Sequence, residues 1–244
     1  MPLSELIAAL EALAPPALSE SWDNTGLLLG DRATEVTRAL TCLTLTPDVA
    51  AEAVAGGVQL VVTHHPLLFK PVQRLTTDSV EGRTVVTLLR AGVAVYSPHT
   101  AWDNAPQGIN QQLAELCELQ DVAPLRSADS FVEPSQGAGR CGRLPRAMTL
   151  QELTALVRQR LNAPGLQFVG DPTMKIERLG IACGAAAEFW QDARRADCQA
   201  LLTGEARFHA ALECREAGFG LIVAGHYATE RHGMERLAKL LAER

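Results

Sequence analysis

Residues 46–66 read TPDVAAEAVAGGVQLVVTHHP, and this stretch predicts a helix, a strand and a pair of histidines in that order. Thr46 is a suitable N-cap, Pro47 suits the first helical turn, and two glycines end the helix. Residues 58–63 form a continuous apolar, β-branched run, which is typical of a strand buried on both faces. A helix that leads into a buried strand is the building unit of α/β proteins.

The same alternation continues along the chain. We expect a helix over 80–91 that ends at Gly92, a strand over 93–97 and a helix over about 106–118. A TLQE capping box at 149–152 begins a helix that reaches about Asn162. Further strands are expected at LQFVG, ERLGIAC, CQALLT and GLIVAG, with helices at about 185–197, 206–217 and from 228 onward. The expected fold class is α/β, with mostly parallel or mixed sheets covered by helices.

Composition excludes several classes of protein. The 244 residues are 47% apolar and carry a net charge of −6, which argues against general nucleic-acid binding. No apolar run approaches the roughly 20 residues of a membrane span. The first residues resemble an amphipathic helix with two glutamates rather than a signal peptide, and the six cysteines form no CxxC pair. We therefore expect a cytoplasmic protein with reduced thiols and no membrane partner.

Two features concern the organisation of the chain. Residues 121–147 are rich in Pro, Gly and Ser, and they are the best candidate for a linker or a domain boundary. Three segments share a helix end, an apolar strand and then polar residues, which suggests two related halves; they are AGGVQLVVTHH, RRADCQALLTGEARFH and EAGFGLIVAGHYATE.

Residue types that commonly bind metals follow three of the expected strands. In open α/β sheets functional groups collect beyond the carboxyl ends of the strands. The side chains at these positions are His64, His65, His99, Asp103, His226 and Glu230. Imidazole and carboxylate together suit Zn, Fe, Mn or Ni rather than Ca or Mg alone.

Spacing suggests how these ligands could be used. His226 and Glu230 are four residues apart at the start of a helix, so both can face one point. On a regular strand His64 and His65 would point to opposite sides. At a strand end followed by Pro66 the backbone turns, and each imidazole could address a different ion. Three histidines and two carboxylates are too many for one open catalytic ion and suit two ions bridged by a carboxylate and a water. His99 could be a ligand, a supporting group or a general base.

Other conspicuous residues have simpler explanations. Spacing alone favours structural roles for His209 and His232. Trp22 lies in SWDNTG, where Asp-Asn-Thr-Gly is turn chemistry, and it could be a core aromatic residue near a turn. Cys42, Cys183 and Cys198 lie in apolar runs and are expected in the core.

Several strings together carry a family resemblance: WDNTGLLLG, VVTHHPLLFK, SPHTAWD, LLTGEARFH and AGHYATE. They resemble, in the same order, the signature blocks of the NGG-one-interacting-factor-three-like family, whose members are widely labelled GTP cyclohydrolase 1 type 2 homologues. The length resembles the short bacterial form. The chain departs from the usual pattern at Ala101-Trp102, before the ligand Asp, and at Phe208-His209, where the family often has two histidines.

The resemblance implies an assembly and a ligand assignment. It implies two intertwined α/β halves, expected at 1–125 plus 226–244 and at 126–225, in a toroidal homohexamer. It also implies two divalent metal ions per chain, one held by His65, Asp103 and Glu230. The other would be held by His64, His226 and Glu230, with Glu230 shared.

Two functions from different classes fit these residues. The first is a metal-dependent hydrolase of a nucleotide-like substrate, in which His99, or less readily His209, moves a proton; the family label suggests attack on the purine ring of GTP. The alternative is a metal-handling or scaffold ring without turnover. A ring around single-stranded nucleic acid is a weaker hypothesis because the net charge is acidic.

Overall fold

A computed structural model describes residues 1–127 and 136–243, and the chain forms two compact units. The first unit comprises Met1–Trp102 and Met234–Arg244, and the second comprises Asp103–Gly233. The boundaries expected from the sequence follow residues 125 and 225. Two helices, α4 (His99–Asn104) and α9 (His226–Ala242), contribute residues to both units.

The first unit is built on a four-stranded mixed sheet. The order of its strands is β1 (Gly26–Leu29), β4 (Ala94–Ser97), β3 (Leu60–Thr63) and β2 (Ala39–Cys42). The strands β2, β3 and β4 are parallel, and β1 pairs antiparallel with β4. The carboxyl ends of the three parallel strands therefore lie at one edge of this sheet.

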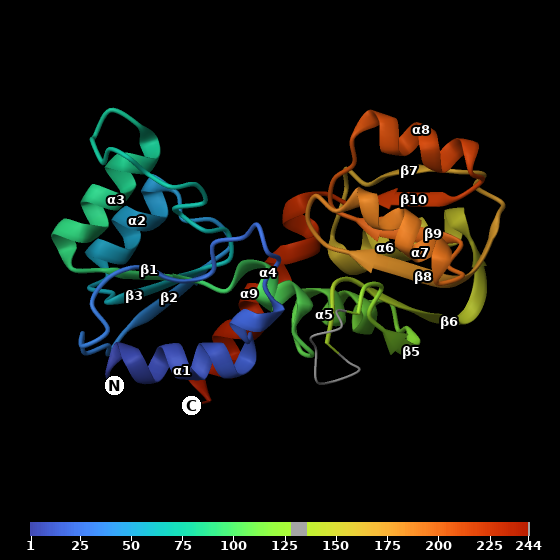
Figure 1. Cartoon of the computed structure of the whole chain (residues 1–244). Helices are drawn as coiled ribbons and strands as arrows, with labels where there is room; N and C mark the ends of the chain where they lie inside the picture. Colours follow the sequence, from blue (N-terminus) through green and yellow to red (C-terminus); the bar gives the residue numbers. More distant parts are fainter. Residues whose placement is uncertain (128–135, 244) are drawn as a thin grey trace. The chain divides into compact units, whose positions relative to one another are not determined.

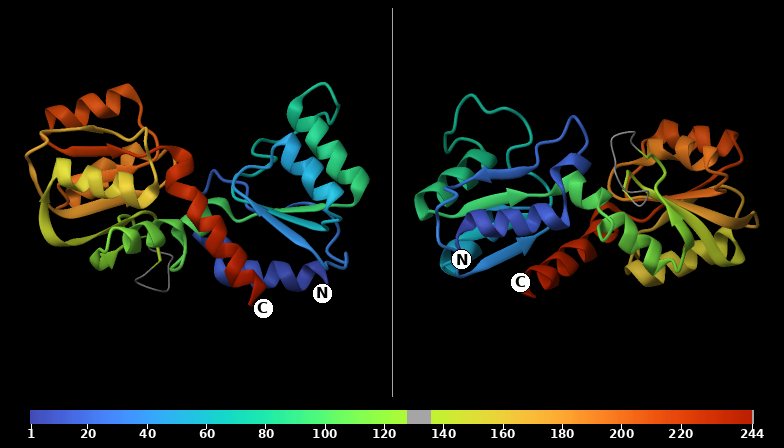
Figure 2. Two further views of the ribbon diagram at one scale, coloured as in Figure 1. Left: turned by 180° about the vertical axis from the view of Figure 1, so that it is seen from behind. Right: turned by 60° about the horizontal axis from the view of Figure 1, so that its bottom comes forward.

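Helices cover both faces of the first sheet. Figure 1 shows α2 (Pro47–Ala55) and α3 (Val80–Ala91) on one face, with α1 (Leu3–Leu13) on the other. Both α2 and α3 match their expected ranges, and a short 3-10 turn, η1 (Pro16–Leu18), follows α1. The apolar side chains of α2 and α3 pack on Val61 and Val95 of the central strands. In both views of Figure 2 the C-terminal half of α9 lies near α1, and the two helices line a common groove.

The second unit contains a six-stranded mixed sheet. The order is β5 (Gln120–Ala123), β6 (Arg140–Thr149), β8 (Lys175–Ala182), β9 (Ala200–Thr203), β10 (Gly220–Val223) and β7 (Gln167–Val169). The strands β8, β9 and β10 are parallel, and the other pairs are antiparallel. The expectation of mixed α/β sheets is confirmed. The expectation of a linker or boundary over 121–147 is wrong at both ends of this segment, which form β5 and β6. Residues 128–135 of the segment lie outside the described residues.

The helices of the second unit form its two outer layers. They are α5 (Ile109–Leu116), α6 (Leu150–Leu161), η2 (Ala187–Phe189), α7 (Trp190–Arg195) and α8 (Phe208–Glu216). The capping box expected between Thr149 and Glu152 is present at the start of α6. Leu201 and Leu221 face α7 and α8, whereas Gly220 lies against the α6 side of the sheet. Buried strands with both faces covered explain the continuous apolar runs in the sequence.

The strands β3 and β9 begin with the same arrangement of hydrogen bonds. Gln59 Oε1 accepts from the two backbone N–H groups of residues 37 and 38, at 3.0 and 2.9 Å. Gln199 Oε1 accepts from those of residues 177 and 178, at 2.9 and 2.8 Å. Each glutamine Nε2 also donates to the carbonyl two residues earlier. The two units therefore share one local motif, in agreement with the repeat in the sequence.

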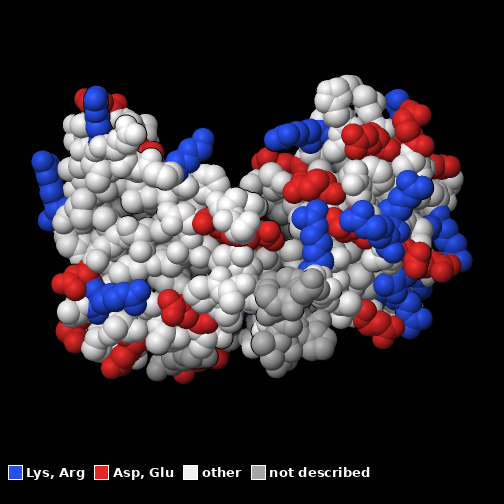
Figure 3. All heavy atoms as spheres, in the orientation of Figure 1, with Lys and Arg blue, Asp and Glu red and all other residues white. Residues whose placement is uncertain are grey.

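The helices and the surface charges can be compared with those of membrane and nucleic-acid binding proteins. Among the residues that the structure describes, no helix is both long and apolar enough to cross a membrane. On the face drawn in Figure 3, basic and acidic side chains are interspersed over the second unit.

Candidate metal centre

The first pair of candidate ligands follows β3 directly. All four residues of β3 are buried, and the parallel pairing continues past the strand, because His64 N and His65 N donate to the carbonyls of Cys42 and Leu43 at 3.0 Å each. His64 is fully buried, and Ser97 Oγ donates to its carbonyl oxygen at 2.7 Å. The register of the sheet therefore holds the backbone of both histidines at its carboxyl edge.

The two imidazoles lie close together. Their ring centroids are 5.1 Å apart, at 55° to one another. His65 Nδ1 lies 2.7 Å from Thr44 Oγ1, so the threonine hydroxyl orients that ring. The strand β3 ends at Thr63, just before the histidines, as expected for a pair at a strand end. With Nδ1 held by the hydroxyl, Nε2 is the natural ligand atom of His65.

His99 completes a group of three histidines in the first unit. Its ring centroid lies 5.2 Å from that of His64 and 5.9 Å from that of His65. His99 Nδ1 lies 2.7 Å from Asp23 Oδ1, and because a carboxylate can only accept, the imidazole donates. The backbone of His99 has φ +29°, a conformation that non-glycine residues adopt at a cost and that is often found at functional sites.

Asp23 is held as a carboxylate. Burial would raise its pKa, but hydrogen bonds from His99 and Thr100 outweigh that effect and keep the pKa of Asp23 below its ordinary value. The backbone N–H of Thr100 donates to Asp23 Oδ2 at 3.2 Å, and the Thr100 hydroxyl also donates to that oxygen. Because Nδ1 of His99 donates to Asp23, Nε2 is the nitrogen of this ring that can gain or lose a proton.

The other candidate ligands belong to the second unit, where His226 and Glu230 start α9. His226 Nε2 lies 3.1 Å from Glu230 Oε2, as the four-residue spacing predicts. On the opposite side of the ring, His226 Nδ1 lies 3.0 Å from Glu205 Oε1. The hydrogen bond with Glu230 is the main cause that raises the pKa of His226 to about 9, against desolvation and with support from Glu205.

Asp103 lies beside a buried thiol. Cys183 Sγ is 3.2 Å from Asp103 Oδ1, and the backbone N–H of Cys183 donates to Asn110 Oδ1 at 2.9 Å. Burial, together with the charges of Asp103 and Glu230, holds the pKa of the Cys183 thiol well above its ordinary value. Cys183 therefore keeps its proton and donates it to Asp103, which orients the carboxylate.

Gly184 makes room for the carboxylate of Glu230. Its backbone has φ +64°, and a Cβ at this position would collide with Glu230 Oε1. The Gly184 carbonyl accepts from the N–H groups of Gly204 and Glu205 at 2.9 Å each, so the loop cannot readily turn away. The backbone conformation therefore favours a glycine here, and any side chain would force the Glu230 carboxylate to move.

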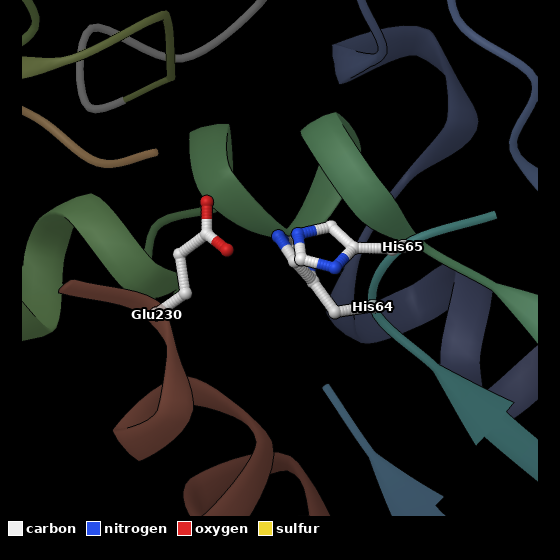
Figure 4. Close-up of side chains that lie close together, drawn as sticks. All are labelled: His64, His65 and Glu230. Atoms are coloured by element: carbon white, nitrogen blue, oxygen red, sulfur yellow. The ribbon is translucent and has the colours of Figure 1, made fainter. Parts of the chain in front are cut away.

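Figure 4 shows three of the predicted ligands, His64, His65 and Glu230. These three residues form a group that could hold a metal ion. Glu230 is buried, as is His64. Two imidazoles and a carboxylate are ligands that divalent Zn, Fe, Mn and Ni share.

The structure distributes the predicted residues between two local groups. His64, His65 and His99 lie together in the first unit, and Asp103, His226 and Glu230 surround the Cys183–Gly184 segment in the second. His209 is exposed at the start of α8 and, with Glu205, lines a separate cavity of about 890 Å³.

Three supporting residues escape sequence reasoning. Asp23 and Cys183 contact their partners across 76 and 80 residues of sequence, so no local pattern indicates these contacts. Glu205 follows β9 as the histidines follow β3, and its place after a buried strand was a usable signal. Trp22, which could have been a core aromatic residue, is instead 60% exposed.

Fold and side-chain types together define an α/β protein of two related units with a group of histidine and carboxylate side chains that could hold a metal ion. The sequence matches the family described as Duf34/NIF3 (NGG1p interacting factor 3) over residues 1–244. The chain belongs to this family, so the resemblance of the sequence motifs is confirmed.

Named relatives and a solved structure agree with this assignment. Proteins named "GTP cyclohydrolase 1 type 2 homolog" from Clostridium perfringens and from a Nostoc species are 31% and 36% identical to this chain. The alignments cover 100% and 99% of this chain and 92% and 91% of those proteins. The crystal structure of a hypothetical protein from Staphylococcus aureus is similar with a TM-score of 0.90 and 27% identity, over 100% of this chain and 92% of the other.

Proposed function

We propose that the chain is a metal-dependent hydrolase with two divalent ions, acting on a nucleotide-like substrate. The observation that carries the proposal is the group of His64, His65 and Glu230, which supplies two kinds of ligand for these metals. Asp103 and His226 would complete the ligand set, in which Glu230 would serve both ions. The names of the relatives make GTP the first substrate to test.

The surroundings of the proposed ligands fit a metal. His226 turns Nε2 toward Glu230 while Glu205 holds Nδ1, which is the common arrangement of a ligand histidine backed by a carboxylate. A proton now joins Nε2 to Glu230, and an ion bound there would displace it, so binding releases a proton. Gly184 provides space beside the Glu230 carboxylate that any other residue would fill.

The chemistry of a hydrolase needs an ion and a proton carrier. When bound, the ions would supply Lewis-acid chemistry, which stabilises developing negative charge and makes water more acidic. His99 would carry the proton, because Asp23 fixes the protonated Nδ1 and leaves Nε2 basic. The Cys183 thiol would orient Asp103 and keep that carboxylate in a fixed direction.

The test begins with metal content. Protein purified without chelator should contain about two ions per chain by elemental analysis, and Glu230→Gln should lose most of them. Glu235→Gln is the matched control, since it removes an exposed carboxylate from the same helix. A wild-type protein that binds no Zn, Mn or Fe after reconstitution would overturn the proposed ligand set.

Turnover separates a hydrolase from a metal-handling protein. With the bound metal identified, the wild type is tested for formate release from GTP and for hydrolysis of a panel of nucleotides and phosphoesters. His99→Asn should retain the metal and lower turnover by about 10²- to 10⁴-fold. Metal binding without turnover on any substrate would instead favour storage or delivery of ions, and light scattering would test the expected homohexamer.

A further inference from the structure

Two exposed aromatic side chains lie next to His99 in the first unit. Trp22 is 60% exposed and Phe69 is 44% exposed. Their ring centroids are 6.0 Å apart at 68°. His99 lies 6.2 Å from Trp22 at 78° and 6.3 Å from Phe69 at 90°, so the three rings are close to mutually perpendicular and form an aromatic corner.

Hydrogen bonds of neighbouring residues hold this aromatic corner in place. Asn24 Nδ2 donates to the carbonyl of Leu68 at 2.5 Å, which joins the segment of Trp22 to that of Phe69. Asp23, the residue after Trp22, accepts from His99 Nδ1 at 2.7 Å. The rings are thus positioned by polar contacts beside them rather than by their own burial. Two large apolar rings fixed in an exposed position are typical of a binding surface.

We propose that Trp22 and Phe69 bind the flat, conjugated ring of a nitrogen heterocycle, which stacks on one ring and meets the other edge-on. Aromatic rings prefer these two arrangements at centroid distances of about 4.5–7 Å. The His99 side chain, 16% exposed, lies at the same corner and can meet ring nitrogens or carbonyl groups. This inference rests on the proposed function and assigns the recognition of its substrate to these residues.

The features of the corner favour a small ring over a protein partner. Two exposed side chains cover far less than the roughly 800 Å² that each partner contributes to a standard protein interface. A heterocycle supplies both a flat face and polar edge atoms.

The experiment measures binding of GTP, ATP and neopterin to the metal-loaded full chain by calorimetry. Tripolyphosphate serves as the probe without a ring. Trp22→Leu should weaken binding of the ring-bearing probes by about 5- to 100-fold, the range for losing one stacked base. Trp22→Phe should restore part of the affinity, and binding of tripolyphosphate should not change. Phe208→Leu is the control, because Phe208 is an exposed aromatic residue in the second unit.

Several outcomes would overturn the assignment. These are failure of the wild type to bind all three ring probes at millimolar concentration, and equal affinities for Trp22→Leu and Phe208→Leu. A change in oligomeric state in Trp22→Leu without a change in ring binding would mean that the rings contact a protein. Ring binding that persists after chelation, without turnover, would retain the aromatic corner and refute the hydrolase. Unchanged turnover in Trp22→Leu would instead retain the hydrolase and refute the aromatic corner.

Discussion

Replacing Gly184 by alanine tests whether the Glu230 carboxylate has to occupy its present position to bind metal. The new methyl group would collide with Glu230 Oε1, and the Gly184 backbone is held at φ +64° by two hydrogen bonds to its carbonyl. Glu230 therefore has to move. Gly218→Ala is a matched control in the same unit, since Gly218 has φ +65° and open space around its Cβ position.

The two substitutions should have different effects on stability and metal binding. A left-handed backbone costs an alanine about 1–2 kcal/mol, so both variants should lose about that much unfolding free energy. Only Gly184→Ala should add a steric cost and weaken metal binding, by about 10- to 100-fold, because it displaces a ligand. In a Glu230→Ala background the obstacle is gone, and Gly184→Ala should cost no more stability than Gly218→Ala.

The assay combines urea unfolding of the metal-free proteins with metal titration of the folded ones. Equal metal affinity in Gly184→Ala and Gly218→Ala would refute the reasoning, because the carboxylate would then bind metal without its present position. An excess cost of Gly184→Ala that survives in the Glu230→Ala background would show that the collision involves another group.

Two further predictions concern stability. The pKa of Asp192 is held below its ordinary value by the guanidinium groups of Arg126 and Arg195, which outweigh its burial, so the charged carboxylate stabilises the fold above its ordinary pKa. Asp192→Asn should cost about 1 kcal/mol at pH 7, because both arginines are largely exposed, and the difference from wild type should shrink as the pH falls below 3.8 in urea melts. Thr149→Ala should cost about 1 kcal/mol by removing a capping box, measured by thermal unfolding. Thr46→Ala should cost less, because the Thr46 side chain makes no capping hydrogen bond to its helix, and an equal loss would contradict the assignment.

The sequence predicts those elements whose signals are local. The buried runs around β3 and β9, and the capping box of α6, depend on neighbouring residues and are found where expected. The strand β1 is missed because its few residues are only partly buried and follow turn-forming ones. The strands β5 and β6 are missed because Pro, Gly and Ser obscure a pattern that antiparallel pairing nevertheless accommodates.

In the candidate site, too, only the features with local sequence signals could be predicted. The histidines after β3 and the His226–Glu230 pair are visible as spacing, because a strand end or one helical turn fixes their geometry. The partners that orient them depend on contacts between distant segments, such as Asp23 with His99 and Cys183 with Asp103. A buried cysteine in an apolar run has the same sequence pattern whether or not it faces a carboxylate, and only the folded chain distinguishes the two.

The shared glutamine motif has a consequence for symmetry. His64 and His65 follow Gln59 by five and six residues. Gly204 and Glu205 follow Gln199 by the same numbers of residues, so the two pairs occupy equivalent positions in the two units. In the first unit two imidazoles thus follow β3. In the second unit a carboxylate that orients His226 follows β9. Two identical subunits could only have repeated the same ends. Two related units in one chain can diverge separately, so they can present two chemically inequivalent sets of groups.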